Sequence, residues 1–333
     1  MNYNSNNHLV RFADFEYARA AFVDARTPGS NLKENYCIIG KGVSQDSRQP
    51  VHIRKTDGFH IGAAGQPPGI VNSLHTHFSA EIFMIFKGKF RIFWGSDGEN
   101  EAVLGPGDII SVPVNCFRGF EVIGDNNGFL FTVLGGDKCG GGIVSHPDVI
   151  LEGRKYGLYL LKDGTLADAE AGDPVPEEGK LFPLMGQSEI NAMDSYSEEE
   201  MMLYVSLWSK KASGISDFTR AGDFTCYHIS GHPSHSDNFE IKSKDGVCVY
   251  SYSMVTGGLV PMHYRKEKQV LINLFGDVLI TFQDSDLMPV VLGPGDVYDM
   301  PKESVYSLSG IRGNSYTYCV VKGDKAGPPE IRM

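Results

Sequence analysis

Three residues of the kind that bind metal ions stand close together in the sequence, at His75, His77 and Glu81. Residues two apart in a β-strand share one face, so both imidazoles can point the same way, and Glu81 opens the next apolar stretch. Two imidazoles and one carboxylate form a facial triad, which leaves positions open on an octahedral ion. Fe(II) is the usual metal for this set, and Mn, Ni, Co, Cu and Zn are the alternatives. An isolated His-x-His pair is more often a chance surface pair, so the flanking residues decide its meaning.

Glycines frame these residues at Gly69 and Gly88, and the segment reads G-x5-H-x-H-x3-E-x6-G. This pattern resembles the first motif of the cupin superfamily at every defined position. The segment from Gly107 to Arg118 resembles the second motif, G-x5-P-x-G-x2-H, with Asn115 at the second glycine and Arg118 at the last histidine. Asn tolerates the left-handed backbone that such a turn requires. The resemblance implies a jelly-roll barrel that carries a metal site.

Arg118 stands where the family's last metal-binding histidine is usual. A guanidinium stays protonated at neutral pH and cannot bind a metal. If Arg118 points inward as that histidine does, it can pair with an anionic substrate such as a carboxylate or an enolate. Two alternatives stay open: a salt bridge to Glu81 that closes the barrel, and displacement of the metal by the arginine.

Two further groups of residues are candidates for the site. His60, in GFHIGAA, can act as a pocket acid or base or as an extra ligand, or it can be a core histidine with satisfied hydrogen bonds. Phe83, Phe120 and Trp94 can supply apolar walls to a substrate pocket, although such aromatic residues are more often core. The predicted catalytic residues are therefore Arg118 and His60, and the predicted substrate contacts are Arg118 and the three aromatic side chains.

An internal repeat organises the chain. VLGPGD occurs at 103–108 and again 188 residues later (291 − 103), at 291–296. The same offset, without a gap, relates Asp57-Gly58 to Asp245-Gly246, Gly69 to Gly257, His75 to His263, Gly88 to Gly276 and Pro113 to Pro301. A period this long indicates a duplicated domain. Together with the cupin motifs, the duplication looks like a bicupin, the architecture of oxalate decarboxylases and quercetin dioxygenases.

The second copy lacks most of the ligands of the first. It retains His263, but Arg265, Gln269 and Tyr306 stand where His77, Glu81 and Arg118 stand in the first copy. One imidazole beside a cation holds a divalent ion poorly, so we expect no metal there. Packing, dimerisation or lid formation are the expected roles, and a metal-free ligand pocket lined by Arg265 and Tyr306 is the alternative.

The segments around the motifs read as short β-strands. EIFMIFKGKFRIFWG (81–95) and QVLINLFGDVLITFQ (269–283) are β-branched and aromatic, and each is interrupted by one glycine, which predicts two hairpins. The Gly-Pro-Gly-Asp segments predict tight turns. The predicted fold class is all-β: two tandem cupin (double-stranded β-helix, or jelly-roll) barrels with a few short helices, one of them over 12–26.

Length and composition indicate the domain division. The 333 residues suit two domains of about 150 residues each. Residues 163–189 are rich in proline, glycine and acidic residues, as linkers are. We therefore expect an N-terminal extension (1–30), an N-terminal barrel with the metal site (31–162), a linker (163–200) and a C-terminal barrel with a degenerate site (201–333).

Charge and hydropathy exclude several kinds of partner. The net charge is −11 and no block of Lys and Arg occurs, which argues against nucleic acid. The six cysteines are scattered, as expected for reduced thiols in a cytoplasmic protein. No signal peptide or membrane-spanning apolar run is recognisable. Exposed sheet edges on two barrels favour a homodimer.

Three classes of function fit these residues. The first is a non-haem Fe(II) dioxygenase or other oxygenase, which binds O2 and a small oxygenated or aromatic, anionic metabolite; the three-ligand set with a cation nearby favours it over a lyase, and the open metal positions favour an enzyme over a binder. The second is a redox-neutral metal-dependent lyase, isomerase or decarboxylase. The third is a non-catalytic small-molecule-binding cupin. The fold by itself does not choose among them, because one fold hosts many chemistries.

Overall fold

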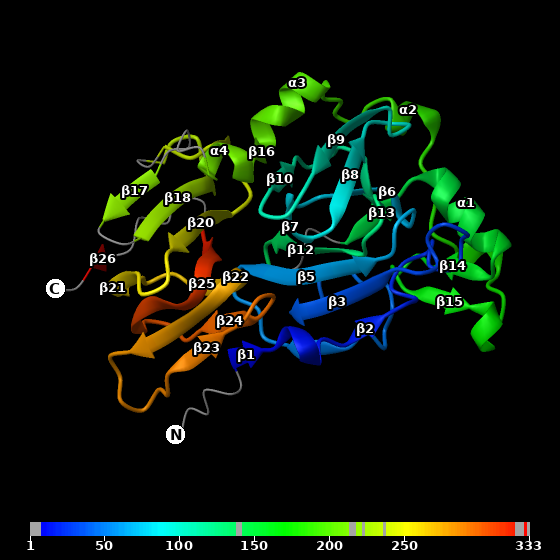
Figure 1. Cartoon of the computed structure of the whole chain (residues 1–333). Helices are drawn as coiled ribbons and strands as arrows, with labels where there is room; N and C mark the ends of the chain where they lie inside the picture. The colour runs from blue at the N-terminus through cyan, green and yellow to red at the C-terminus, as the bar shows by residue number, and fades with distance from the viewer. Residues whose placement is uncertain are drawn as a thin grey trace. The chain divides into compact units, whose positions relative to one another are not determined.

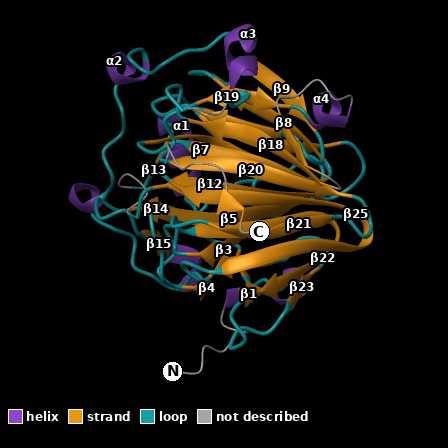
Figure 2. Ribbon diagram, turned by 90° about the vertical axis from the view of Figure 1, so that its left-hand side faces the viewer, coloured by secondary structure: helices purple, strands orange, loops and turns teal. Residues whose placement is uncertain are grey.

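β-strands dominate both halves of the chain in the computed structural model (Figures 1 and 2). The structure describes residues 8–137, 142–212, 218–221, 224–235, 238–323 and 330–331. These residues form two compact units. The N-terminal unit comprises residues 16–54 and 60–205, and the C-terminal unit comprises residues up to 15, 55–59 and those from 206 onward. The predicted all-β class is confirmed.

Two sheets form the barrel of the N-terminal unit. The larger sheet has the strand order β16-β10-β7-β12-β5-β3-β2, with β4 beside β3. Its strands are β2 (Tyr17–Ala18), β3 (Glu34–Ile39), β4 (Val51–Ile53), β5 (Phe59–Gln66), β7 (Glu81–Lys87), β10 (Ile109–Val112), β12 (Gly128–Gly135) and β16 (Val205–Ser206). The smaller sheet has the order β13-β6-β11-β8-β9. Its strands are β6 (Val71–His77), β8 (Lys89–Trp94), β9 (Asn100–Leu104), β11 (Arg118–Ile123) and β13 (Ile143–Ser145).

Shorter elements follow this barrel in the same unit. They are α1 (Pro147–Lys155), β14 (Leu158–Leu160), β15 (Leu166–Asp168), α2 (Gln187–Ile190) and α3 (Glu198–Met201). The segment 163–200, which is predicted from the sequence to be a linker, therefore lies within the N-terminal unit. The indole Nε1 of Trp94 donates to the carbonyl of Tyr196 at 2.8 Å, which fastens this segment to β8.

One sheet forms the C-terminal unit, in the order β1-β24-β22-β25-β20-β18-β17 with β19, β21, β23 and β26 on its sides. Its elements are β1 (Leu9–Val10), α4 (Trp208–Ala212), β17 (Phe218–Ala221), β18 (Phe224–Gly231), β19 (Ile241–Lys242), β20 (Val247–Met254), β21 (Leu259–Tyr264), β22 (Gln269–Phe282), β23 (Val290–Leu292), β24 (Val297–Met300), β25 (Val305–Lys322) and β26 (Glu330–Ile331). Because β1 pairs with β24, residues 8–15 belong to this unit and are not a separate extension.

The two predicted hairpins are wrong. β7 pairs with β10 and β12, whereas β8 pairs with β11 and β9, so the chain crosses from one sheet to the other at Gly88. In the second copy, β22 runs through Gly276 as one long strand whose register with β25 shifts beside this glycine. The glycine in the apolar run therefore marks a crossing between sheets in the first copy and a register shift within one strand in the second.

The helix expected over 12–26 is also wrong. The structure has a single 3-10 turn at Phe12–Asp14 and the short strand β2 there. Residues 19–33 instead run beside β6, where the Gly29 carbonyl accepts from the Val71 amide at 2.7 Å. This segment takes Asp24 and Lys33 into the interior of the N-terminal unit, where both side chains are buried.

The Gly-Pro-Gly-Asp turns form as predicted in both copies. Asp108 Oδ2 accepts from the Gly105 amide at 2.8 Å, and Asp296 Oδ2 accepts from the Gly293 amide at 2.9 Å. Asn115 has φ 61°, so it adopts the expected left-handed backbone. Its counterpart in the second copy is Glu303, which has φ 60°. The turn therefore keeps its conformation without glycine in both copies.

Five cysteines are free and buried in the described part of the chain, and Cys139 lies outside it. No helix of the described residues is long and apolar enough to cross a membrane.

The bend between β7 and β8 gives a test of the fold. At Gly88 (φ 77°) an added Cβ would lie 2.7 Å from Gly128 Cα and 2.9 Å from the Asn127 carbonyl oxygen, whereas at Gly124 (φ 88°) it would meet nothing within 4 Å. Gly88→Ala is expected to cost about 1–3 kcal/mol more than Gly124→Ala, because only the first adds a backbone clash.

The measurement uses Trp94, one of only two tryptophans in the chain. In a Trp208→Phe background, fluorescence during urea unfolding reports the N-terminal unit alone. Equal midpoints for the two alanine variants would contradict the close approach at Gly88.

Candidate metal centre

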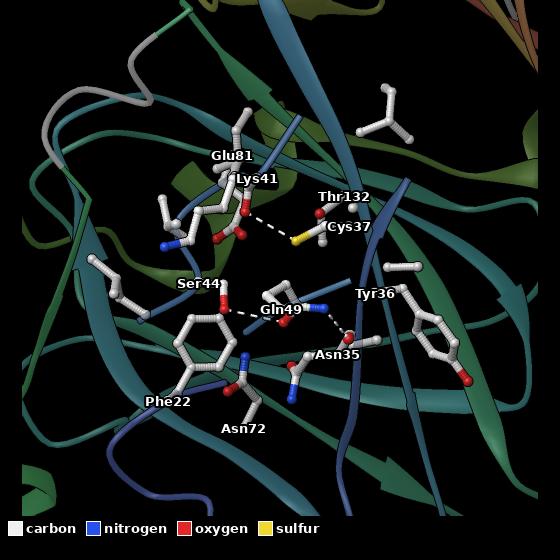
Figure 3. Close-up of a pocket in the computed structure, with 18 of the residues that line it drawn as sticks. Phe22, Asn35, Tyr36, Cys37, Lys41, Ser44, Gln49, Asn72, Glu81 and Thr132 are labelled. Carbon is white, nitrogen blue, oxygen red and sulfur yellow. Dashed lines mark hydrogen bonds between the residues drawn. The ribbon is translucent and has the colours of Figure 1, made fainter. Parts of the chain in front are cut away.

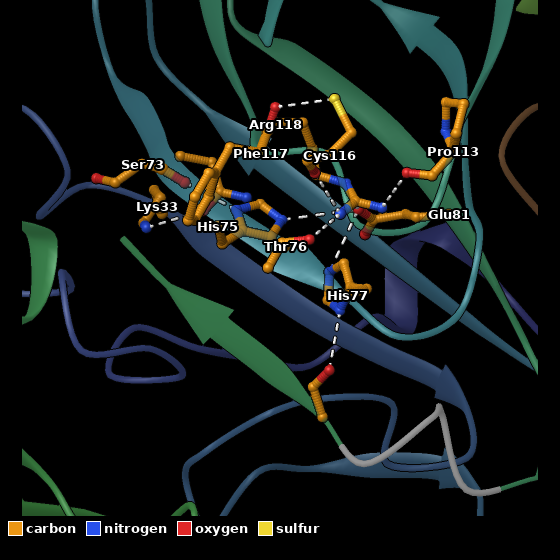
Figure 4. Close-up of polar contacts among 12 residues, drawn as sticks. Lys33, Ser73, His75, Thr76, His77, Glu81, Pro113, Cys116, Phe117 and Arg118 are labelled. Atoms are coloured by element: carbon orange, nitrogen blue, oxygen red, sulfur yellow. Dashed lines mark hydrogen bonds and ion pairs between the residues drawn. The ribbon is translucent and has the colours of Figure 1, made fainter. Parts of the chain in front are cut away.

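Two neighbouring strands bring the predicted triad together. His75 and His77 alternate along β6, and Glu81 is the first residue of β7. Glu81 Oε2 lies 3.4 Å from His77 Nε2 and 3.7 Å from His75 Nε2, and the three donor atoms all lie within 4.8 Å of one another. All three side chains are buried (Figure 4).

The outer nitrogens of both imidazoles are occupied by backbone carbonyls. His75 Nδ1 lies 2.8 Å from the Ser73 carbonyl oxygen, and His77 Nδ1 lies 3.1 Å from that of Gly142. A carbonyl only accepts, so each Nδ1 carries a hydrogen and donates it. A neutral imidazole with its hydrogen on Nδ1 presents a lone pair on Nε2, and both Nε2 atoms face Glu81, which is the arrangement found in metal-binding histidines.

His77 and Glu81 face each other without a hydrogen bond. Among the described residues, neither His77 Nε2 nor Glu81 Oε2 has a hydrogen-bond partner. Burial lowers the pKa of His77 despite the pull of Glu81, so the imidazole is neutral at neutral pH. Two buried acceptors 3.4 Å apart repel each other unless a cation lies between them. The three side chains therefore fit a divalent metal ion.

Arg118 contacts the same carboxylate oxygen that faces the imidazoles. Its Nε is 3.5 Å from Glu81 Oε2, and the side chain is fully buried. The guanidinium donates to the carbonyl of Cys116 at 3.0 Å and makes longer contacts with Thr76 Oγ1 and the Pro113 carbonyl. This is the geometry of the salt-bridge alternative, in which Arg118 fixes Glu81 in place.

These neighbours keep Glu81 ionised. Burial by itself would raise the pKa of Glu81, but His77, His75 and Arg118 outweigh it, and the pKa lies well below its usual value. Arg118 contributes a permanent positive charge to this effect. The carboxylate is thus ready to bind a cation.

A buried ion pair is hydrogen-bonded to the backbone of β6. Lys33 Nζ donates to Asp24 Oδ2 at 2.5 Å, and Asp24 Oδ2 also accepts from the Ser73 amide at 3.2 Å. Ser73 in turn accepts from His75. Burial by itself would raise the pKa of Asp24, but the Lys33 ammonium and the Ser73 hydrogen bonds outweigh it and lower the pKa. Sequence reasoning missed this pair because it assigned Asp24 to an extension.

A small cavity of about 60 Å³ opens beside the triad (Figure 3). A buried water needs about 10–15 Å³ of such space, so the cavity holds roughly four to six waters or a ligand of that size. His75, His77 and Glu81 line one part of it, and apolar side chains such as Phe22, Phe120 and Leu134 line another. Arg118 is not among the described residues that line this cavity.

The structure does not bring His60 into the site. Its Nδ1 accepts from the Gly42 amide at 3.1 Å, and its Nε2 lies 3.0 Å from the Asp137 carbonyl oxygen. Both ring nitrogens are therefore used by the backbone. This matches the alternative of a core histidine with satisfied hydrogen bonds.

The three aromatic side chains predicted to contact substrate lie in different surroundings. Phe120 lines the cavity, and Phe83 packs edge-on behind it with ring centroids 5.3 Å apart. Trp94 is fully buried and lies beside Arg118 on the neighbouring strand. Of the three, only Phe120 is placed to touch a ligand in this cavity.

The second copy keeps the geometry and changes the chemistry. His263 pairs with Tyr306 across β21 and β25, as His75 pairs with Arg118 across β6 and β11. The Tyr306 hydroxyl donates to Gln269 Oε1 at 2.8 Å. A tyrosine–glutamine hydrogen bond therefore fills the place of the carboxylate–arginine pair.

No protein-family model and no curated protein sequence matches this chain. Solved structures do match it over 96% of its length. Fold and strand register together define the class: the chain has the bicupin fold, as its duplicated motifs predict.

Among the similar structures are several of oxalate decarboxylase from Bacillus subtilis. The enzyme at pH 4.6 is 12% identical with a TM-score of 0.59, and 77% of that chain is covered. A single-substitution variant is 13% identical with a TM-score of 0.60 and 78% coverage. A third structure, from work on the Mn(II) centres of that enzyme, is 12% identical with a TM-score of 0.58 and 78% coverage. At identities this low, the likeness in structure establishes the fold alone.

The Asp24–Lys33 pair gives a second prediction. Asp24→Asn leaves a buried lysine without its counter-ion and is expected to cost about 3–5 kcal/mol at pH 7. The control is Glu152→Gln, which breaks the exposed pair with Lys155 and is expected to cost less than about 1 kcal/mol.

The same pair sets a pH dependence. Since the folded-state pKa of Asp24 lies below the ordinary value of 3.8, its stabilisation is present above pH 3.8 and is lost as the pH falls through the folded-state value. Urea unfolding followed by Trp94 checks both points. A gap between wild type and Asp24→Asn that stays constant at low pH would argue against the ion pair.

Proposed function

We propose that this protein is a metal-dependent lyase that acts on a small carboxylic acid, most simply by decarboxylation. The observation that carries the proposal is the pair of facing buried acceptors, His77 Nε2 and Glu81 Oε2, at the edge of a small cavity. The redox-neutral alternative is favoured over the oxygenase because the similar bicupin structures are of a decarboxylase. Their Mn(II) centres favour Mn(II) over Fe(II) as the metal.

His75, His77 and Glu81 would hold the ion through Nε2, Nε2 and a carboxylate oxygen. A bound divalent ion supplies Lewis acidity, which withdraws electrons from a coordinated carboxylate or carbonyl. In decarboxylation the bond between the carboxylate carbon and its neighbour breaks, CO2 leaves, and a proton from solvent takes its place on that neighbour.

The protein's own groups prepare this site. The carbonyls of Ser73 and Gly142 hold the two imidazoles in the tautomer that presents Nε2. Arg118 keeps Glu81 charged and fixed. With one carboxylate, one guanidinium and a divalent ion, the centre carries a net positive charge, which attracts an anionic substrate.

Metal analysis tests the centre. Purified protein reconstituted with Mn(II) is expected to bind about one ion per chain, and Glu81→Gln is expected to weaken binding at least about 100-fold. The matched control is His263→Ala, which removes the equivalent histidine of the second copy and is expected to leave the stoichiometry unchanged. No metal in the wild-type protein would overturn the proposal.

The reaction class is tested by mass balance. With a panel of small carboxylic acids, a lyase releases CO2 without matching consumption of O2. Stoichiometric O2 uptake, sensitive to a chelator, would instead support the oxygenase.

A further inference from the structure

The cavity beside the triad has a second polar end. Asn35 on β3 and Asn72 on β6 line it together with the triad, and both side chains are buried. Figure 3 shows their amide groups at the opposite end of the cavity from Glu81. A molecule in this cavity therefore meets the triad at one end and amides at the other.

A β-bulge places Asn72 on the inner face. Residues three apart on a regular strand point to opposite faces, so Asn72 and His75 should not share one. Opposite β11, however, His75 pairs with Arg118 and Asn72 pairs with Phe120, so β6 contains one extra residue between these two pairs. The bulge turns both side chains to the same face of the sheet.

The second copy has the same bulge with a different residue. There His263 pairs with Tyr306 and Val260 pairs with Leu308, which is again three residues against two. Val260 is thus the counterpart of Asn72. The copy that keeps the metal-binding triad has an amide at this position, and the copy that has lost it has an aliphatic side chain.

The orientation of the Asn72 amide is fixed by Lys33. An ammonium only donates, and Lys33 Nζ lies 3.2 Å from Asn72 Oδ1. The amide nitrogen Nδ2 must therefore be the atom that faces away from Lys33. No described residue accepts a hydrogen bond from it.

Asn35 adds a second donor. Its Nδ2 is buried and has no hydrogen-bond partner among the described residues. The neighbouring Gln49 is bonded elsewhere: its Oε1 accepts from the Ser44 hydroxyl and its Nε2 donates to the Asn35 backbone carbonyl. A buried amide hydrogen without an acceptor is costly, so the Asn35 donor calls for an oxygen atom from a ligand, and the Asn72 amide lines the same cavity.

We propose that Asn35 and Asn72 determine specificity by binding an oxygen acceptor, a carboxylate or a carbonyl, at the far end of a small bifunctional carboxylic acid. The inference rests on the proposed function, in which the near end of that acid meets the metal. The volume of about 60 Å³ limits the ligand to a few carbon atoms. Monofunctional acids of the same size would leave both amides without a partner.

The test uses Mn(II)-loaded protein, with malonate and acetate as calorimetric probes. Wild type is expected to bind malonate more tightly than acetate. Asn72→Val, which copies the residue of the second copy, is expected to weaken malonate about 10- to 100-fold, the value of hydrogen bonds to a charged group, and to leave acetate unchanged. The control variant is Asn126→Val, at an exposed turn, which is expected to change neither affinity.

A second variant guards against loss of folding. Asn72→Asp keeps the shape and the acceptor for Lys33 but replaces the donor with an anion, so malonate binding should fall further while acetate binding stays. Equal loss of malonate and acetate in Asn72→Val, or malonate binding as tight as wild type, would overturn the inference.

The metal and the amides are separated by a parallel titration. In chelator-treated protein the malonate affinity of wild type is expected to be lower overall and still to exceed that of Asn72→Val. Wild type that takes up no metal but keeps this difference would sink the proposed function and leave the amide site standing. No difference in either preparation sinks the amide site.

Discussion

The N-terminal site depends on one buried carboxylate. Glu81 is buried, and its Oε2 faces the Nε2 atoms of two imidazoles and the guanidinium of Arg118. Burying a charge is unfavourable unless it is paired, and Arg118 lies 3.5 Å from this oxygen without a hydrogen bond to it. A metal cation held by the three donor atoms would complete the pairing. The surrounding backbone carbonyls, the Arg118 contacts and the Asp24–Lys33 pair all keep this arrangement in place.

The duplicated barrel shows how little of the scaffold has to change when the chemistry does. Strand pairing at the equivalent positions is the same in both copies, as are the bulge before the first histidine and the left-handed residue in the second motif. The second copy has replaced a charged pair by the Tyr306–Gln269 hydrogen bond, which satisfies both groups without an ion. Burial lowers the pKa of His263 to about 4, so this histidine is neutral as well.

The likeness to oxalate decarboxylase establishes architecture, and the substrate depends on side chains that the fold leaves free to vary. In this chain those side chains include the amides of Asn35 and Asn72 at the far end of the cavity. The segment between residues 19 and 33 also contributes to the cavity. It brings in the lysine that orients Asn72, so the specificity of the cavity depends on residues far from either motif.

The sequence by itself determined the duplication, the all-β class, the tight turns and the grouping of His75, His77 and Glu81. These follow from local patterns: a fixed offset, strand-like composition and motif spacing. It could not determine that β7 and β8 enter different sheets, because a glycine bend and a hairpin turn look alike in one dimension. The sequence also made His60 a catalytic candidate. Only the tertiary structure shows that backbone groups occupy both nitrogens of its ring. The sequence could not identify Asn72 as a cavity residue for a related reason. The direction of its side chain is set by a β-bulge. A bulge is defined by the register with the partner strand, which only the tertiary structure shows.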